Sequence, residues 1–161
     1  MLVRILIALA VTAAGAAHAQ LKPPADFGKP STPQGAQETP FSDPVAEAKE
    51  AAAAKVADEW LKLIDGGEYG KAWDECAPVF REKVTREQWL AGIPKNRADY
   101  GKLNSRKLKG AAYRKSIPGA PAGDYVTVGF ASAFEKNAAA EEVVTLMYHE
   151  GSWRPLGYLL R

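Results

Sequence analysis

The spacing of apolar residues changes once along the chain, near residue 101. Between residues 44 and 101 apolar residues recur every three or four positions, the period of one face of an α-helix. From residue 103 to residue 161 they tend to recur at every second position, the period of one face of a β-strand. Helices followed by antiparallel strands are typical of an α+β domain, in which the helices pack on one face of the sheet. The pattern therefore predicts a single α+β domain over residues 44–161.

About three helices are expected before the sheet. Asp43 can cap the first helix, and Pro44 can occupy its first position, where the missing N–H of proline costs nothing. Gly66-Gly67 should end this helix. A second, short helix should end at Pro78. A third should begin at Thr85, which stands at the capping-box distance from a glutamine.

Four antiparallel strands are expected after the helices, and their alternating apolar residues should place one face of the sheet against the helices. The other face carries several small or apolar residues. A homodimer formed through this face is one interpretation, and an ordinary half-exposed face is the other, because scattered apolar residues are normal on protein surfaces. The expected strands span residues 103–115, 124–134, 141–149 and 153–161, and the second face carries Tyr125, Thr127, Gly129, Ala131, Ala133, Val143 and Met147.

The N-terminus has the three parts of a secretory signal peptide. Arg4 gives a positive start, residues 5–14 form an apolar run, and Ala17-His18-Ala19 supplies a small-residue cleavage site. The apolar run is about ten residues long, whereas a membrane-spanning helix needs about 20. We therefore expect cleavage between Ala19 and Gln20 and a periplasmic or secreted bacterial protein, with an uncleaved anchor as the less favoured alternative.

The segment from residue 20 to residue 43 contains five prolines among glycine and polar residues, a composition that indicates a disordered tether. No later stretch is apolar enough to span a bilayer, so no transmembrane segment is expected in the mature chain. Removal of Arg4 leaves 20 basic and 19 acidic residues. This near-neutral balance does not favour nucleic acid as a partner. Cys76 is the single cysteine, which excludes an internal disulfide.

Several short motifs within residues 50–161 occur in an order and spacing that resembles a known family. They are Trp60-Leu61-x-Leu63-Ile64-Asp65-x-Gly67-x-Tyr69, Trp73, Trp89, the stretch 101–106, Pro118-Gly119-Ala120-Pro121-x-Gly123-x-Tyr125, Phe134, Glu141 and Trp153-x-x-x-Gly157-Tyr158. The chain is similar in these residues to an uncharacterised bacterial exported family, domain of unknown function 4019. The resemblance implies the cone-shaped, nuclear-transport-factor-2-like fold of the cystatin-like superfamily, with a curved four-stranded sheet. It brings no catalytic residues, and this fold hosts both enzymes and binding domains.

The sequence lacks the residues that most catalytic mechanisms need. A structural zinc site takes about four Cys or His ligands, and the chain after residue 19 holds only Cys76 and His149. Glu141 and Glu142 should point to opposite faces of a strand and so should not chelate one ion together. The glycine-rich motifs that bind phosphate groups do not occur in the sequence. We therefore expect no metal, no cofactor and no catalytic histidine.

Acid–base catalysis by a buried carboxylate is the one enzymatic mechanism that the sequence leaves open. An acidic side chain held against apolar walls has a raised pKa and can transfer protons near neutral pH. Asp65, Asp99 and Glu141 are candidates, although surface positions or helix caps explain them more simply. The aromatic residues can line a pocket or, more simply, pack in the core. The candidate pocket consists of Trp60, Trp73, Tyr125, Glu141 and Tyr158.

Basic residues are concentrated in the segment 95–115, which contains a single acidic residue. Arg106, Lys107 and Lys109 form a candidate surface for an acidic partner or an anionic envelope polymer. A solvated strand whose lysines discourage edge pairing explains the same residues. The leading hypothesis is an exported, non-catalytic domain that binds a protein partner or a small ligand. The alternative is a small cofactor-free enzyme of the isomerase or dehydratase type.

Overall fold

The computed structural model describes residues 43–161, so the expected signal peptide and nearly all of the expected tether lie outside the described residues. Helices precede strands, which confirms the predicted α+β class. The helices are α1 (Pro44–Asp65), α2 (Tyr69–Asp74), α3 (Pro78–Lys83) and α4 (Arg86–Ala98). The strands are β1 (Leu103–Arg114), β2 (Tyr125–Phe134), β3 (Ala140–His149) and β4 (Ser152–Leu160).

Helix α1 has the ends that its sequence predicts. The Asp43 side chain accepts a hydrogen bond of 2.9 Å from the backbone N–H of Val45, and Pro44 occupies the first turn. At the other end Gly67 has a φ of 73°, a left-handed conformation that favours glycine. The face of α1 between these ends is buried through Ala53, Ala54, Ala57, Trp60, Leu61 and Ile64.

Residues 43–161 contain four helices where about three were expected. Pro78 does not end a helix but occupies the first turn of α3, where proline needs no hydrogen-bond acceptor for an N–H. The region expected to hold one short helix therefore holds two. Helix α4 begins with the predicted capping box, because Thr85 and Gln88 exchange hydrogen bonds of 2.9 and 3.3 Å. The helix then continues through Pro94.

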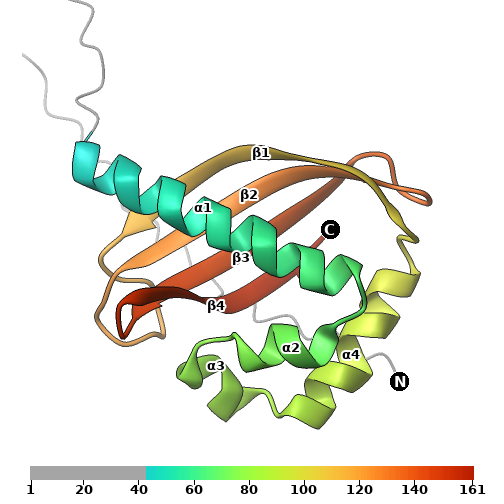
Figure 1. Ribbon diagram of the computed structural model, residues 1–161, viewed down its shortest axis with the longest axis horizontal. Coiled ribbons are helices and arrows are strands. Elements are labelled where there is room, and N and C mark those ends of the chain that lie inside the picture. The colour runs from blue at the N-terminus through green and yellow to red at the C-terminus, as the bar shows by residue number, and fades with distance from the viewer. Residues whose placement is uncertain (1–42) are drawn as a thin grey trace, which may run out of the picture. The chain divides into compact units, whose positions relative to one another are not determined.

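The four strands form one antiparallel sheet in the order β1-β2-β3-β4. Strands that follow one another in sequence are therefore neighbours, and β1 and β4 are the edges. Figure 1 shows α1 lying across the sheet, while the three shorter helices gather beside β4. The tight turn between β3 and β4 has positive φ at Glu150 and Gly151.

The main core lies between α1 and the sheet, where Trp60 and Leu61 pack with Val126, Val144 and Leu146. The opposite face of the sheet is covered at one end only. There Tyr125 and Met147 are buried together with Ala77, against Val79, Ile117, Ala120 and Leu156. The remaining five residues expected on this face are partly or fully exposed, so the homodimer stays a prediction.

No helix within residues 43–161 combines the length and the apolar character that a membrane crossing requires.

Candidate functional site

Four charged side chains meet inside the described domain. Asp65 ends α1, Arg97 lies in the last turn of α4, Arg106 lies on β1 and Glu142 lies on β3. The exposed fractions of their side chains are 20%, 8%, 7% and 0%, respectively. Ser132 on β2 and Tyr158 on β4 complete the group, which we term the buried charge cluster.

Glu142 is at the centre of the buried charge cluster. Its Oε2 atom accepts hydrogen bonds from Arg106 Nε at 2.7 Å and from Ser132 Oγ at 2.6 Å. Its Oε1 atom accepts from Tyr158 OH at 2.7 Å and from Arg97 Nη1 at 3.1 Å. Both carboxylate oxygens are thus satisfied inside the protein, as a buried charge requires.

Asp65 closes the buried charge cluster from the end of α1. Arg97 Nη2 lies 2.5 Å from Asp65 Oδ1, and Arg106 Nη1 lies 2.8 Å from Asp65 Oδ2. Each guanidinium therefore bridges Asp65 and Glu142, and the two positive and two negative charges balance. Residues separated by 32 to 45 positions along the chain are joined in this way.

The surroundings of Glu142 keep it ionised. Burial alone would raise the pKa of its carboxyl, but the hydrogen bonds from Arg106, Ser132 and Tyr158 outweigh burial and hold the pKa below its ordinary value. Burial and the charge of Glu142 raise the pKa of the Tyr158 phenol well above its ordinary value. Glu142 is therefore a fixed anion and Tyr158 a fixed donor. The arrangement is suited to holding the helices on the sheet rather than to exchanging protons.

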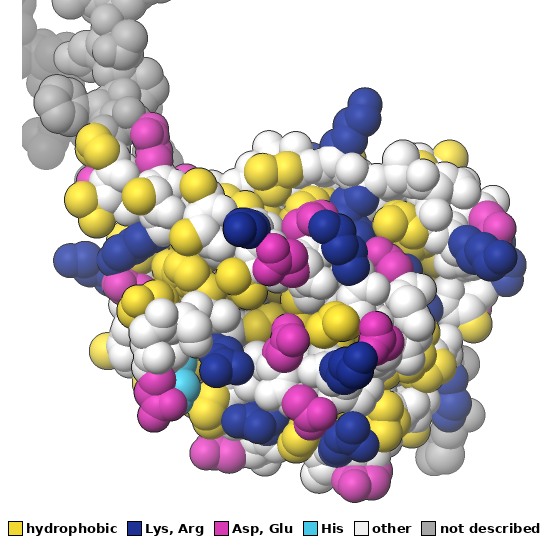
Figure 2. Space-filling view, viewed as in Figure 1, with side chains coloured by type: hydrophobic (Ala, Val, Ile, Leu, Met, Phe, Trp, Pro, Cys, Tyr) yellow, Lys and Arg dark blue, Asp and Glu magenta, His cyan; other side chains and the backbone are white. Residues whose placement is uncertain are grey.

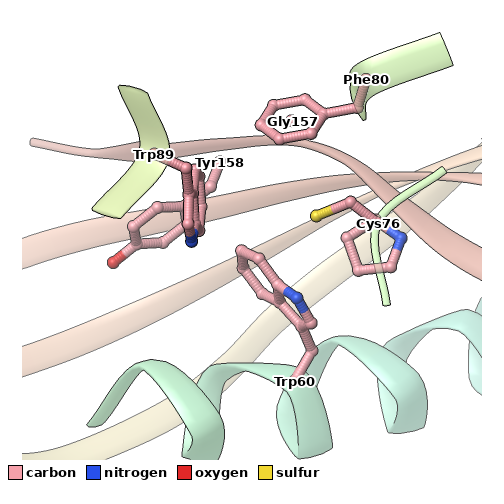
Figure 3. A pocket seen from close by; sticks show the side chains of 7 residues that line it. Trp60, Cys76, Phe80, Trp89, Gly157 and Tyr158 are labelled. Carbon is pink, nitrogen blue, oxygen red and sulfur yellow. The ribbon is translucent and has the colours of Figure 1, made fainter. Parts of the chain in front are cut away.

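Two residues of the candidate pocket, Trp60 and Tyr158, do lie together, but in the packed core. Their ring centroids are 5.7 Å apart, and the centroid of Trp89 is 6.0 Å from that of Trp60. Figure 3 shows these rings with Cys76 and Phe80 around one small space. That space leaves no room for a water molecule. Trp60 also donates a hydrogen bond of 2.8 Å to the carbonyl of Ala72.

The other three residues of the candidate pocket do not line this space, although Trp73 packs against the same core. Trp73 lies beside Arg81 at the surface of α2 and α3, and Tyr125 belongs to the small core on the opposite face of the sheet. Glu141 is partly exposed and accepts hydrogen bonds from Lys109 and Arg161. The five residues therefore do not surround a common cavity.

The sequence reasoning missed three members of the buried charge cluster: Arg97, Ser132 and, at its centre, Glu142. A signal for Glu142 was present, because it shares the alternation of Val144 and Leu146, both of which face the helices. Its neighbour Glu141 takes the opposite face, as predicted for adjacent residues of a strand. Of the other candidate acids, Asp65 joins the buried charge cluster and Asp99 is an exposed residue at the end of α4.

The three residues of the candidate partner surface do not lie on one exposed surface. Arg106 turns to the interior, where it is held by Asp65 and Glu142, so it is not available to a partner. Lys107 is exposed, and the side chain of Lys109 is 56% exposed while it pairs with Glu141. Lys107 and Lys109 alone remain as surface charges of the predicted group.

Metal ligands do not gather in the part of the chain that the structure describes: no three His, Cys, Asp or Glu side chains there are placed to share an ion. Cys76 is buried and donates to the carbonyl of Ala72, and burial raises the pKa of its thiol to about 12. His149 is partly exposed beside Glu150.

The elements and the buried charge cluster define an α+β domain in which four charged side chains tie two helices to a four-stranded meander. A family model described as a protein of unknown function (DUF4019) matches residues 56–158, and the chain belongs to this family. The matched segment begins within α1 and ends at Tyr158, so it contains the whole buried charge cluster. Comparison with curated proteins finds no significant match.

Proposed function

We propose that the protein is an exported, non-catalytic domain that binds an acidic segment of a protein partner through β1. The observation that carries this proposal is an exposed basic edge strand whose backbone is fixed from the inside. The binding surface consists of Lys107, Leu108 and Lys109, which we term the β1 surface.

The β1 surface is open and positively charged. Strand β1 is an edge of the sheet, and residues 107–110 are exposed. Leu108 is 55% exposed and, as the strand neighbour of Lys107, points to the opposite face of the sheet, so that a segment added along the edge can meet a lysine on one face and the leucine on the other. An edge strand flanked by positive charge is suited to an extended acidic segment, which can make both ionic and apolar contacts with it.

Arg106 holds the β1 surface in place. Because its guanidinium binds Glu142 on β3 and Asp65 on α1, the strand is fixed immediately before Lys107. A surface that is already ordered loses little conformational freedom on binding, which favours affinity. The buried charge cluster therefore has an indirect role in binding, through the order that it gives to β1.

Charge on the face of the domain that carries the helices is mixed. Figure 2 shows Lys and Arg side chains interleaved with Asp and Glu on the face that carries the helices, without a large area of one sign. Such a face attracts neither anions nor cations strongly at a distance. This supports β1, rather than the helices, as the surface for an acidic partner.

The non-catalytic part of the proposal rests on Glu142. An isomerase or dehydratase that uses one buried carboxylate needs a pKa raised toward neutral pH. The carboxyl of Glu142 has a lowered pKa and four hydrogen-bonding groups around it. Export and the nuclear-transport-factor-2-like cone belong to the same proposal, the first supported by residues 1–19 and the second by helices packed on an antiparallel sheet.

A peptide titration tests the β1 surface. The probe is a fluorescent extended peptide of alternating Glu and Thr, measured by anisotropy at low and high salt with the protein as isolated. We expect Lys107→Gln/Lys109→Gln to weaken binding about twofold to thirtyfold, because two exposed ion pairs of about 0.2–1 kcal/mol each are lost.

The matched control is Lys55→Gln/Lys83→Gln, which removes two exposed lysines from α1 and α3. This control should bind as the wild type does. Equal weakening of peptide binding by both double variants would contradict a protein partner at β1. So would a wild-type protein that binds heparin more tightly than the peptide.

A further inference from the structure

The surface of α2 and α3 contains an open hollow of about 280 Å³. It is lined by Trp73, Pro78, Arg81 and Glu82 and so combines an aromatic ring, a proline ring, one cation and one anion. None of these residues belongs to the buried charge cluster. The hollow is also distant from the β1 surface along the sheet, because α3 packs near β4, at the opposite edge from β1.

Arg81 is incompletely satisfied in this hollow. Its Nε atom is buried and has no hydrogen-bond partner, and it is the one side-chain nitrogen or oxygen of the described residues in this condition. Arg97 and Arg106, by contrast, direct their guanidiniums at carboxylates. A buried N–H without an acceptor carries a desolvation cost that a suitable acceptor would remove.

Trp73 provides a fixed flat wall beside Arg81. Its indole Nε1 donates a hydrogen bond of 2.9 Å to the carbonyl of Val84, which holds the ring in one orientation. The Arg81 guanidinium lies over this ring, with its central carbon 5.6 Å from the ring centroid. The position of the cation relative to the ring is therefore set before any ligand arrives.

We propose that this hollow binds a small monocarboxylic acid that carries a flat apolar group. The carboxylate pairs with the terminal Nη atoms of the Arg81 guanidinium, in the fork geometry that arginine offers to carboxylates, because the Nε atom is buried beyond its reach. The apolar group packs on Trp73 and Pro78. This site adds a second binding activity and does not depend on the peptide-binding function proposed for β1.

Glu82 restricts the charge of the ligand. It lines the same hollow, and its negative charge opposes negative charge on the ligand. A monoanion that places its charge at Arg81 meets less of this repulsion than a phosphate monoester with nearly two charges. The hollow therefore selects carboxylates over phosphates of similar size.

A ligand series tests the site. The ¹⁵N-labelled protein, as isolated from the producing cells, is titrated with phenylacetate, phenylacetamide and phenyl phosphate while the indole N–H of Trp73 and the Nε–H of Arg81 are followed by NMR. Phenylacetate should cause saturable shifts of both signals. The neutral amide should bind about tenfold more weakly, because the charge-assisted hydrogen bonds are lost, and phenyl phosphate should also bind more weakly.

Two variants separate the site from general effects of charge. Arg81→Gln should reduce phenylacetate binding about tenfold, while Lys83→Gln, which removes one exposed positive charge from the same helix, should change it less than about twofold. A dispersed amide spectrum verifies that Arg81→Gln is folded. Absence of saturation at millimolar phenylacetate, equal binding of acid and amide, stronger binding of the phosphate, or unchanged binding by folded Arg81→Gln would each overturn the proposal.

Discussion

At the scale of single residues, Glu141 and Glu142 differ completely although they are adjacent and chemically identical. Glu142 has no exposed side-chain surface and binds two arginines, a serine and a tyrosine. Glu141 lies on the other face of β3 and forms exposed ion pairs with Lys109 and Arg161. A buried pair depends strongly on each partner, whereas an exposed pair contributes little. The two positions therefore form a matched pair for mutation.

Glu142→Gln should lower the free energy of unfolding by about 3 kcal/mol, because it leaves two buried guanidiniums without their central anion. Glu141→Gln should change it by less than about 1 kcal/mol. Urea denaturation followed by circular dichroism measures both values. Equal losses in the two variants would mean that the buried charge cluster does not hold the fold together.

Glu142 should also make the stability of the protein depend on pH. The folded pKa of Glu142 is lowered, so its stabilising contribution is complete above the unfolded value of about 4.3 and is lost as pH falls through the folded value. The stability difference between wild type and Glu142→Gln should therefore be constant from pH 7 to about pH 5 and shrink below about pH 4. Unfolding free energies at a series of pH values measure it. A difference that grows on acidification contradicts this sign.

At the scale of elements, the buried charge cluster holds β1 in register with the rest of the domain. Arg106 is the cluster residue that β1 supplies, and β1 is the outermost strand. The strand also has register irregularities near Asn104 and Lys109. Loss of Arg106 should therefore loosen β1 before it loosens the inner strands.

Arg106→Gln should accelerate hydrogen exchange of β1 amides more than that of β3 amides, whereas Lys107→Gln, at the exposed neighbouring position, should leave both unchanged. Amide exchange followed by NMR gives the comparison. Uniform acceleration in all four strands would show that the strand does not open separately.

The elements themselves were largely predictable, because their signals are local. Asp43, Pro44 and the capping box at Thr85 mark helix starts, and the alternation of apolar residues places each strand end within about two residues. Pro78 was wrongly interpreted as a stop, because proline both follows and begins helices. The buried charge cluster was not predicted as a group. Its six members come from six different helices and strands. The alternation of a strand is all that separates the buried Arg106 from its exposed neighbour Lys107.

At the scale of the whole molecule, the described domain carries two independent candidate binding sites, the β1 surface and the hollow on α2 and α3. We propose that residues 1–19 direct these surfaces out of the cytoplasm, because these residues have the three parts of an export signal. The length of the apolar run predicts cleavage rather than retention as a membrane anchor.

The mature protein should begin at Gln20. Intact-mass measurement of the protein from the envelope fraction or the medium should give the mass of residues 20–161, because the small side chains of Ala17 and Ala19 suit a signal peptidase. Ala19→Arg should leave the precursor uncut. A wild-type mass that includes Met1 would contradict export by cleavage.

The burial of Cys76 has a consequence for the export that we propose. Oxidising compartments join thiols into disulfides, and the thiolate is the species that reacts. With the pKa of its thiol raised to about 12 and its Sγ atom directed at the carbonyl of Ala72, Cys76 is almost entirely protonated and shielded while the chain is folded. The fold itself thus serves as the protecting group for the lone cysteine. Two chains can become linked through Cys76 only after both have exposed it by unfolding, so that a disulfide-linked dimer records past loss of structure.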